Sequence, residues 1–279
     1  MLKKPPWLRV KYSHSMKAVE DIINKHSLNT VCIEAKCPNC SECFSKKTAT
    51  FMILGTQCTR SCRFCNINNG IPQPVDPNEP EKIANGIIEL GLKYVVITSV
   101  TRDDLLDGGA AHFANVIRRI NEKAPNTTVE VLIPDFGGNI NLLELVIDAS
   151  PQVISHNIET VADFYSLARP QACYQRSLTL LKNIKTLNDK IKTKTGIMLG
   201  LSETKAQIIT TLNDLKAVEC NYLTLGQYLA PSSKHLPVSE YIKPEQFDEY
   251  KIIAEKMGFE YVASAPFVRS SYNASAAII

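Results

Sequence analysis

The stretch ATFMILGTQCTRSCRFC, residues 49–65, joins an apolar run to a group of three cysteines. The apolar part, FMILG at residues 51–55, has the length and composition of a buried strand. Cys58, Cys62 and Cys65 follow it, so we expect them in the loop that leaves this strand. Parallel sheets carry their functional groups in such loops, at the carboxyl ends of their strands. The stretch therefore predicts both a strand and a functional edge.

Similar strand-length runs recur along the rest of the chain, separated by amphipathic segments. Further strands are predicted at residues 94–100, 128–134, 153–159, 194–200, 222–229 and 261–267. Apolar residues at helical spacing are clearest at residues 81–92, 112–124 and 206–218. Strands that alternate with helices pair in parallel, and this repetition favours an α/β fold of the partial TIM type, a (β/α)6 barrel. A doubly wound open sheet is the alternative, because periodicity does not separate closed from open sheets.

The composition narrows the class of protein. The chain has 279 residues, of which 44% are hydrophobic and 21% charged, as is ordinary for a globular protein. This length fits one large α/β domain, which we favour, or two small ones. Its net charge of +3 is too small to indicate a nucleic-acid partner. The longest apolar runs have the length of strands, and no signal-peptide pattern follows the basic start. We therefore expect a cytoplasmic monomer with neither nucleic acid nor membrane as a partner.

Cysteines are concentrated near the predicted first strand, where residues 32–65 hold most of the nine in the chain. Cytosolic thiols are kept reduced, so metal or cluster binding is favoured over disulfides. Three thiolates in a C-x3-C-x2-C pattern can bind three irons of a cubane cluster and leave the fourth iron open. Zinc is the main rival, although its sites usually contain paired cysteine knuckles or histidine, and residues 49–65 contain no histidine. Buried, inert thiols are the other alternative.

The C-x3-C-x2-C loop, with Phe64 before its last cysteine, resembles the signature of radical S-adenosylmethionine enzymes. The resemblance implies that Cys58, Cys62 and Cys65 hold a 4Fe-4S cluster. The open iron of that cluster would bind S-adenosylmethionine and convert it to methionine and a 5′-deoxyadenosyl radical. The stretches ITSVTRDD (97–104) and GIMLGLSE (196–203) fit cofactor-binding elements of that family.

The same resemblance implies a set of contacts to S-adenosylmethionine. The expected cofactor-binding residues are Phe64, Thr98, Ser99, Asn157, Glu159 and Gly200. A turn or packing role is the alternative for Gly200. For Asn157 and Glu159 the alternative is a structural hydrogen-bond network.

A second group of cysteines precedes the first strand. Its C-x4-C-x5-C pattern, together with RSSY at residues 269–272, resembles the lipoyl synthase family, and the likeness extends over nearly the whole chain. The resemblance implies an auxiliary 4Fe-4S cluster that is consumed as a sulfur donor. Its ligands would be Cys32, Cys37, Cys43 and Ser270. An alkoxide is a harder ligand than thiolate, so the iron held by Ser270 would be the easiest to release.

Cys40 permits another set of ligands. Cys37, Cys40 and Cys43 form a C-x2-C-x2-C pattern with ferredoxin-like spacing. By family resemblance we expect Cys40 to be a spare thiol near the auxiliary cluster. Cys173 and Cys220 lie in helical or helix-terminal sequence and are expected to be buried or neutral thiols.

The activity implied by the resemblance is that of a sulfurtransferase. Two sulfur atoms would be inserted at C6 and C8 of an octanoyl chain that is amide-linked to a lysine of a lipoyl carrier domain. Such methylene carbons offer neither an acidic proton nor an electrophilic centre, so radical chemistry suits the task. The rivals are a non-catalytic iron–sulfur or zinc protein and, among radical enzymes, biotin synthase.

The resemblance also implies partners and a division of the chain. The partners would be octanoylated lipoyl domains of 2-oxoacid dehydrogenase E2 subunits and the glycine cleavage H protein, an electron donor such as ferredoxin or flavodoxin, and an iron–sulfur carrier that repairs the cluster. Residues 1–48 would form an N-terminal extension with the auxiliary-cluster cysteines. Residues 49–260 would form the barrel, and residues 261–279 a C-terminal segment carrying RSSY.

Overall fold

The computed structural model describes residues 3–8, 17–34, 37, 39–45 and 50–277. The chain divides into two compact units. The amino-terminal unit comprises Lys11–Arg60 and Asn66–Ile154, and the carboxyl-terminal unit comprises Met1–Val10, Ser61–Cys65 and Ser155–Ile279. The expected domain boundary between residues 48 and 49 lies outside the described residues.

The amino-terminal unit is built on a mostly parallel sheet. Its strands follow the order β1 (Asn29–Thr30), β2 (Thr50–Ile53), β5 (Tyr94–Ser99), β6 (Thr128–Leu132) and β7 (Val153–Ser155), the last of which ends at the unit boundary. Strands β2, β5 and β6 pair in parallel, whereas β1 is antiparallel to β2. A separate parallel pair joins β3 (Gln57–Cys58) to β4 (Asn68–Asn69).

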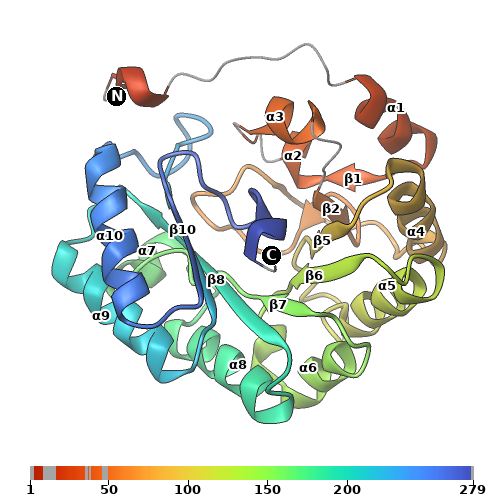
Figure 1. Ribbon diagram of the computed structural model, residues 1–279. Coiled ribbons are helices and arrows are strands. Elements are labelled where there is room, and N and C mark those ends of the chain that lie inside the picture. Colours follow the sequence, from red (N-terminus) through yellow and green to blue (C-terminus); the bar gives the residue numbers. More distant parts are fainter. Residues whose placement is uncertain (1–2, 9–16, 35–36, 38, 46–49, 278–279) are drawn as a thin grey trace. The chain divides into compact units, whose positions relative to one another are not determined.

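Helices cover this sheet. The longer ones are α4 (Glu79–Leu90), α5 (Ala110–Lys123) and α6 (Ile140–Ile147), which lie together along one side of β2, β5 and β6 (Figure 1). The shorter ones are α1 (Lys17–Lys25), α2 (Val31–Glu34), α3 (Cys40–Ser45) and the 3-10 turn η2 (Phe136–Gly138). Every residue of β2 is buried, as expected for a parallel strand covered on both faces.

The strand register aligns the carboxyl ends of β2, β5 and β6. Ile53 pairs with Ser99, and Thr98 pairs with Leu132. The loops that leave these three strands therefore start at one edge of the sheet. This edge receives the residues that follow Ile53, including Cys58, as the sequence predicts.

The carboxyl-terminal unit repeats the α/β pattern. Its strands lie in the order β8 (Lys192–Leu199), β9 (Tyr222–Gln227) and β10 (Tyr261–Ser264), all parallel. Helices α8 (Tyr174–Leu187), α9 (Lys205–Ala217) and α10 (Pro244–Lys256) lie along one side of these strands (Figure 1). Shorter elements are η1 (Pro6–Leu8), η3 (Ala162–Phe164), α7 (Tyr165–Ala168) and η4 (Ala274–Ala277).

The structure confirms the α/β class, the parallel pairing and the predicted strands and helices, although the strands end one to four residues earlier than predicted. The largest difference is β7, which ends at Ser155, whereas the sequence predicts a strand as far as Glu159. Glu159 has a φ of 67°, in the left-handed region, and makes only an isolated bridge to Ile197. A left-handed residue cannot continue a strand.

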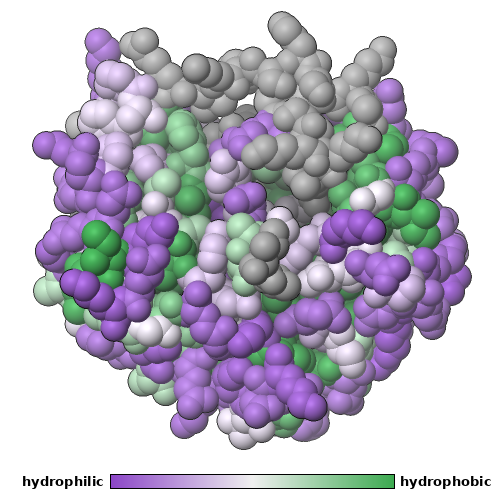
Figure 2. Space-filling model, in the orientation of Figure 1, coloured by the Kyte–Doolittle hydropathy of each residue, from purple (hydrophilic) through white to green (hydrophobic). Residues whose placement is uncertain are grey.

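Polar residues cover most of the surface seen in Figure 2, and the hydrophobic areas on it are small and separate. Among the described residues no helix is both long and apolar enough to cross a membrane.

Gly226 of β9 fixes the path of the C-terminal segment. A Cβ atom at this position would lie 2.0 Å from the carbonyl oxygen of Val268 and 3.1 Å from Arg269 Nη1. The backbone before Ser270 therefore crosses β9 where only glycine leaves room. Glycine at this position sets where the RSSY segment begins.

We predict that Gly226→Ala destabilises the fold by about 2 kcal/mol or more, because a methyl group would overlap a backbone carbonyl. Urea unfolding measures this loss, and limited proteolysis should show faster cleavage after residue 265. Gly91→Ala is the matched control. Gly91 has a φ of 64° with no atom near its Cβ position, so backbone strain alone should cost about 1–2 kcal/mol without exposing the C-terminal segment. Unchanged proteolysis in Gly226→Ala would contradict the prediction.

Candidate functional site

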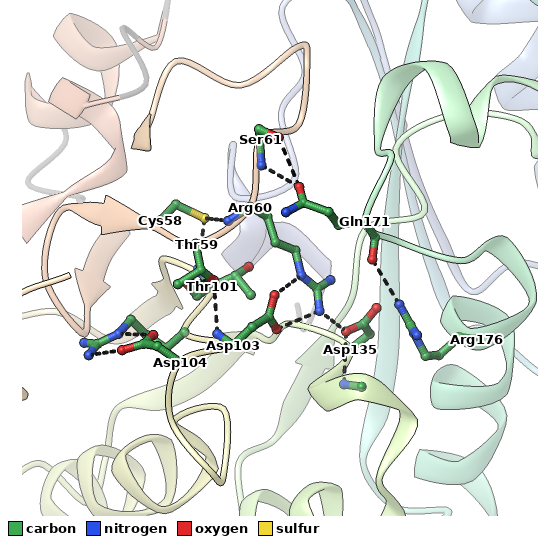
Figure 3. Close-up of polar contacts among 12 residues, drawn as sticks. Cys58, Thr59, Arg60, Ser61, Thr101, Asp103, Asp104, Asp135, Gln171 and Arg176 are labelled. Atoms are coloured by element: carbon green, nitrogen blue, oxygen red, sulfur yellow. Dashed lines mark hydrogen bonds and ion pairs between the residues drawn. The ribbon is translucent and has the colours of Figure 1, made fainter. Parts of the chain in front are cut away.

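Cys58 lies in strand β3, in the loop that leaves β2, and its side chain is partly buried. Two backbone N–H groups donate to its sulfur: Arg60 N lies 3.5 Å from Cys58 Sγ, and Thr101 N lies 3.3 Å from it (Figure 3). Two donors directed at one sulfur atom restrict its position. The sulfur of Cys58 is therefore held in place by the backbone on two sides.

The start of the cysteine loop is held in a left-handed conformation at Leu54, whose φ is 68°. Its amide donates to Glu79 Oε2 at 2.9 Å, and its carbonyl accepts from Arg102 Nη1 at 3.2 Å. Gly109 leaves room for the side chain, because a Cβ there would lie 2.4 Å from Leu54 Cδ1. These contacts offset the strain of a non-glycine residue at positive φ.

Cys62 and Cys65 belong to the carboxyl-terminal unit. The Cys65 amide donates to the Cys62 carbonyl at 3.1 Å, so the two cysteines share one turn. Leu236 N donates to the Arg63 carbonyl at 3.0 Å. His235 Nε2 lies 3.0 Å from the Cys65 carbonyl oxygen. A carbonyl oxygen only accepts, so Nε2 of His235 carries the proton.

Two further contacts support residues 61–65 of the cysteine loop. Ser232 Oγ lies 2.9 Å from His235 Nδ1 and orients the imidazole ring. Phe64 packs against a buried cluster formed by Ala168, Leu201, Tyr228 and Leu236. The expected contact of Phe64 with the adenine stays a prediction.

The N-terminal cysteines are tied to the sheet through β1. Thr30 Oγ1 donates to the Thr50 carbonyl at 2.8 Å and accepts from Cys32 N at 3.2 Å. Asn66, which follows Cys65, donates through Nδ2 to the Glu34 carbonyl at 2.9 Å. The segment that carries Cys32 is therefore held both to β2 and to the chain that leaves the cysteine loop.

Cys32, Cys37, Cys40 and Cys43 lie close together in the amino-terminal unit. Cys37 N donates to the Cys32 carbonyl at 3.1 Å, and Cys40 N donates to the Cys37 carbonyl at 3.3 Å. Burial raises the pKa of Cys40 to about 12, and the negative charges of Cys32, Cys37 and Cys43 contribute to the shift. Cys40 is thus near the other three, as the spare-thiol hypothesis requires.

Asn157, Glu159 and Ser270 meet in the carboxyl-terminal unit. Asn157 Nδ2 donates to Glu159 Oε1 at 3.1 Å and to Ser270 Oγ at 3.0 Å. Asn157 Oδ1 is buried and has no hydrogen-bond partner among the described residues. The structure thus joins two expected cofactor residues to the expected serine ligand, and one buried acceptor remains available to a bound group.

Glu159 is a partly buried residue. Burial raises its pKa, and the positive charges of Arg169 and Arg269 oppose that shift. Arg169 Nη1 also donates to the Asn157 carbonyl at 2.8 Å. A carboxyl group with a raised pKa and two guanidinium groups near an unpaired amide oxygen are able to bind a ligand with hydroxyl and charged groups.

The remaining expected residues have structural partners. Thr98 Oγ1 donates to the Leu132 carbonyl at 3.2 Å, which links β5 to β6, and Ser99 ends β5. Gly200 has a φ of 104°, and a Cβ there would lie 2.4 Å from the Glu240 carbonyl oxygen. A turn and packing role for Gly200 is therefore supported. The cofactor contacts of these residues stay predictions.

The other two cysteines differ in exposure. Cys220 is buried, and burial raises its pKa to about 12, so it is a neutral thiol as expected. Cys173 is exposed and precedes α8.

The predicted site residues did not include His235, Gln171, Asp103 or Asp135, although Asp103 lies in the predicted cofactor element at residues 97–104. Gln171 Oε1 accepts from Ser61 N at 2.7 Å, within the carboxyl-terminal unit. Asp103 and Asp135 bind the Arg60 guanidinium, within the amino-terminal unit. The acidic residues follow the predicted strands at 94–100 and 128–134, and that position was the signal that could have identified them.

Comparison with known proteins identifies the family. Residues 52–215 match the family model of the radical SAM superfamily. The chain is 55% identical over 278 residues to a lipoyl synthase of Alkaliphilus metalliredigens, covering 99% of this chain and 96% of the relative. It is also 55% identical over 274 residues to a lipoyl synthase of Caldicellulosiruptor saccharolyticus, covering 98% of this chain and 96% of the relative.

Solved structures with the same fold are more distant in sequence. Streptococcus suis SuiB bound to S-adenosylmethionine superposes with a TM-score of 0.60 at 13% identity, over 81% of this chain and 54% of SuiB. Methylornithine synthase (PylB) superposes with a TM-score of 0.57 at 12% identity, over 93% of this chain and 81% of PylB. The predicted α/β fold is thereby confirmed, and a partial barrel is consistent with it.

We predict that His235→Ala weakens the cluster expected on the cysteine loop, whereas His235→Gln retains it. Glutamine still offers an N–H donor to the Cys65 carbonyl, and alanine does not. Loss of one hydrogen bond is worth about 1 kcal/mol, so iron should be released to a chelator about fivefold faster in the alanine variant. Equal release rates in His235→Ala and the unaltered protein would contradict this role.

We also predict that Glu159→Gln flattens the pH dependence of stability. A raised pKa means that the folded chain binds the Glu159 proton more tightly than the unfolded chain does. The resulting stability is complete below the ordinary pKa of glutamate and is lost as pH rises through the folded pKa. Urea unfolding of the cluster-free, full-length chain at about pH 5 and about pH 8 measures this difference. An unchanged slope in the variant would contradict the expectation.

Proposed function

The chain belongs to the lipoyl synthase family of the radical SAM superfamily, and from this we propose which of its residues perform each role. The protein is a sulfurtransferase that inserts two sulfur atoms at C6 and C8 of a protein-bound octanoyl-lysine. It uses S-adenosylmethionine and two 4Fe-4S clusters. The assignment of individual residues rests on their chemistry in this structure.

Cys58, Cys62 and Cys65 are proposed to hold the cluster that binds S-adenosylmethionine. Three thiolates suit three irons of a cubane and leave the fourth iron open. The donor set fits the group, because two backbone N–H groups already point at the sulfur of Cys58. The two backbone N–H groups that donate to the Cys58 sulfur, in the loop that follows β2, are the single observation that carries the assignment.

Cys32, Cys37 and Cys43, with Ser270, are proposed to hold the auxiliary cluster. The proximity of the three cysteines in the amino-terminal unit supports the first part. The hydrogen bond from Asn157 Nδ2 to Ser270 Oγ supports the second, because a donor to this oxygen stabilises negative charge on it. Cys40 is proposed as a spare thiol beside this cluster.

When bound, the clusters and S-adenosylmethionine supply the radical that removes hydrogen and the sulfide that replaces it. The chain must bind and orient these groups and exclude water. We propose that Phe64, Asn157 and Glu159 contact S-adenosylmethionine. Thr98, Ser99 and Gly200 are proposed to shape the same site. The unpaired Asn157 Oδ1 and the Glu159 carboxyl group, whose pKa is raised by burial, support this placement.

The domains and partners are also proposals. Residues 1–48 would form the extension that carries the auxiliary-cluster cysteines, residues 49–260 the barrel, and residues 261–279 the segment that carries Ser270. The protein acts on octanoylated lipoyl domains, which we propose belong to E2 subunits of 2-oxoacid dehydrogenases and to the glycine cleavage H protein. A ferredoxin or flavodoxin would supply electrons, a cluster-repair carrier would restore the auxiliary cluster, and the location would be the cytoplasm.

We predict that the reconstituted, reduced protein converts an octanoyl-lysyl peptide into a product with two added sulfur atoms, detected by mass spectrometry. Cys37→Ser should abolish this product, because it removes a thiolate of the sulfur donor. Cys40→Ser is the matched control, since it removes a thiol from the same segment, and it should retain both clusters and the product. Loss of one cluster's iron in Cys40→Ser would favour the Cys37, Cys40 and Cys43 register instead.

A further inference from the structure

Arg60 lies within the cysteine loop, and its side chain points at two acidic residues (Figure 3). Its Nε atom lies 2.7 Å from Asp103 Oδ2, and Nη2 lies 2.9 Å from Asp103 Oδ1. The same Nη2 lies 2.8 Å from Asp135 Oδ1. Asp103 thus receives the two parallel hydrogen bonds of a fork-to-fork pair, and Asp135 receives a third. We call these three residues the Arg60 clamp.

Burial makes the geometry of the clamp specific. The Arg60 side chain is 7% exposed and that of Asp135 is fully buried, whereas that of Asp103 is 45% exposed. A buried guanidinium group must be paired to offset its loss of hydration. Asp135 is itself oriented, because its carboxylate accepts from Gly137 N at 3.2 Å. The clamp therefore allows Arg60 few other positions.

The backbone beside the clamp is bound to the loop that leaves β5. Thr59 donates to the Thr101 carbonyl through both its amide and its hydroxyl group, each at 3.0 Å. Asp103 N donates to Thr59 Oγ1 at 3.0 Å. Asn69 Nδ2 also donates to the Arg60 carbonyl. These bonds hold residues 58–60 against residues 101–103, and the N–H groups of Arg60 and Thr101 then point at the sulfur of Cys58.

We propose that Arg60 is a positioning residue, and that its ion pairs with Asp103 and Asp135 hold the Cys58 sulfur in its ligand position before any cluster is bound. The inference rests on the proposed role of Cys58 as an iron ligand and adds a reason why that ligand is in place. The guanidinium group fixes the loop through its contacts with Asp103 and Asp135.

The neighbouring pair of Arg102 and Asp104 has a different task. Arg102 binds Asp104 through two hydrogen bonds of 2.9 Å and donates to the carbonyl of Leu54, where the loop begins. The segment TRDD at residues 101–104 therefore serves as the support for the cysteine loop. The Arg102–Asp104 pair fixes the start of the loop at Leu54, and the Arg60 clamp fixes Cys58, the first expected ligand.

The test uses two variants of the full-length, reconstituted protein. Asp103→Asn keeps the shape of a partly exposed residue and removes its charge. Arg60→Lys keeps the positive charge and removes the planar group that donates to both carboxylate oxygens of Asp103. Arg119→Met is the control, because Arg119 forms an ion pair with Glu81 on the surface of the same unit, away from the loop. The measurements are iron release from the reduced protein to a chelator, and the change in the electron paramagnetic resonance spectrum on adding S-adenosylmethionine. Thermal unfolding is followed in parallel.

We expect Asp103→Asn and Arg60→Lys to release iron about tenfold faster and to lose most of the spectral change, with Arg119→Met unchanged. The proposal is wrong if Asp103→Asn retains iron and the spectral change as the unaltered protein does. It is also wrong if faster release occurs only where the midpoint of thermal unfolding falls to the same extent, because Arg60 would then stabilise only the fold. Cys58→Ser separates the two levels of inference: a spectral change that persists in this variant would refute the ligand assignment itself.

Discussion

The buried ion pair between Arg60 and Asp135 is the interaction on which the cysteine loop depends. Asp135 follows β6 and Asp103 follows β5. By binding both aspartates, Arg60 ties the loop after β2 to the ends of two neighbouring parallel strands. Hydrogen bonds to both aspartates raise the pKa of Arg60 although burial opposes the shift. The charge is therefore permanent, and the loop must keep a conformation in which it is paired.

Polar contacts also hold other expected ligands of the candidate site. In the carboxyl-terminal unit, His235 and Leu236 hold the turn with Cys62 and Cys65 through backbone carbonyls. Near Ser270, the amide of Asn157 supplies the donor. Iron ligands need a defined geometry, and residues whose own positions are fixed by packing and hydrogen bonds provide it.

The features that the sequence could predict are those encoded over short distances. The alternating strand and helix runs and the spacing of Cys58, Cys62 and Cys65 are local patterns. The runs predict the α/β class, and the spacing indicates the radical SAM superfamily that the family match shows. His235 lies 170 residues from Cys65, and no local pattern connects an isolated histidine with that carbonyl group. The left-handed φ of Glu159 and its isolated bridge to Ile197, in the segment predicted to continue β7, are likewise not indicated by any local pattern. Tertiary contacts of this kind override local propensity.

We propose that the auxiliary cluster, held by Cys32, Cys37, Cys43 and Ser270, donates both sulfur atoms that are inserted into the octanoyl chain. The radical formed with the other cluster removes the hydrogen atoms that these sulfur atoms replace. The most direct measurement is to reconstitute the protein with sulfide of one heavy sulfur isotope and to determine the mass of the product in a single turnover. The account predicts that both inserted sulfur atoms carry the label. Unlabelled sulfur in the product, from a source other than the protein's own clusters, would contradict it.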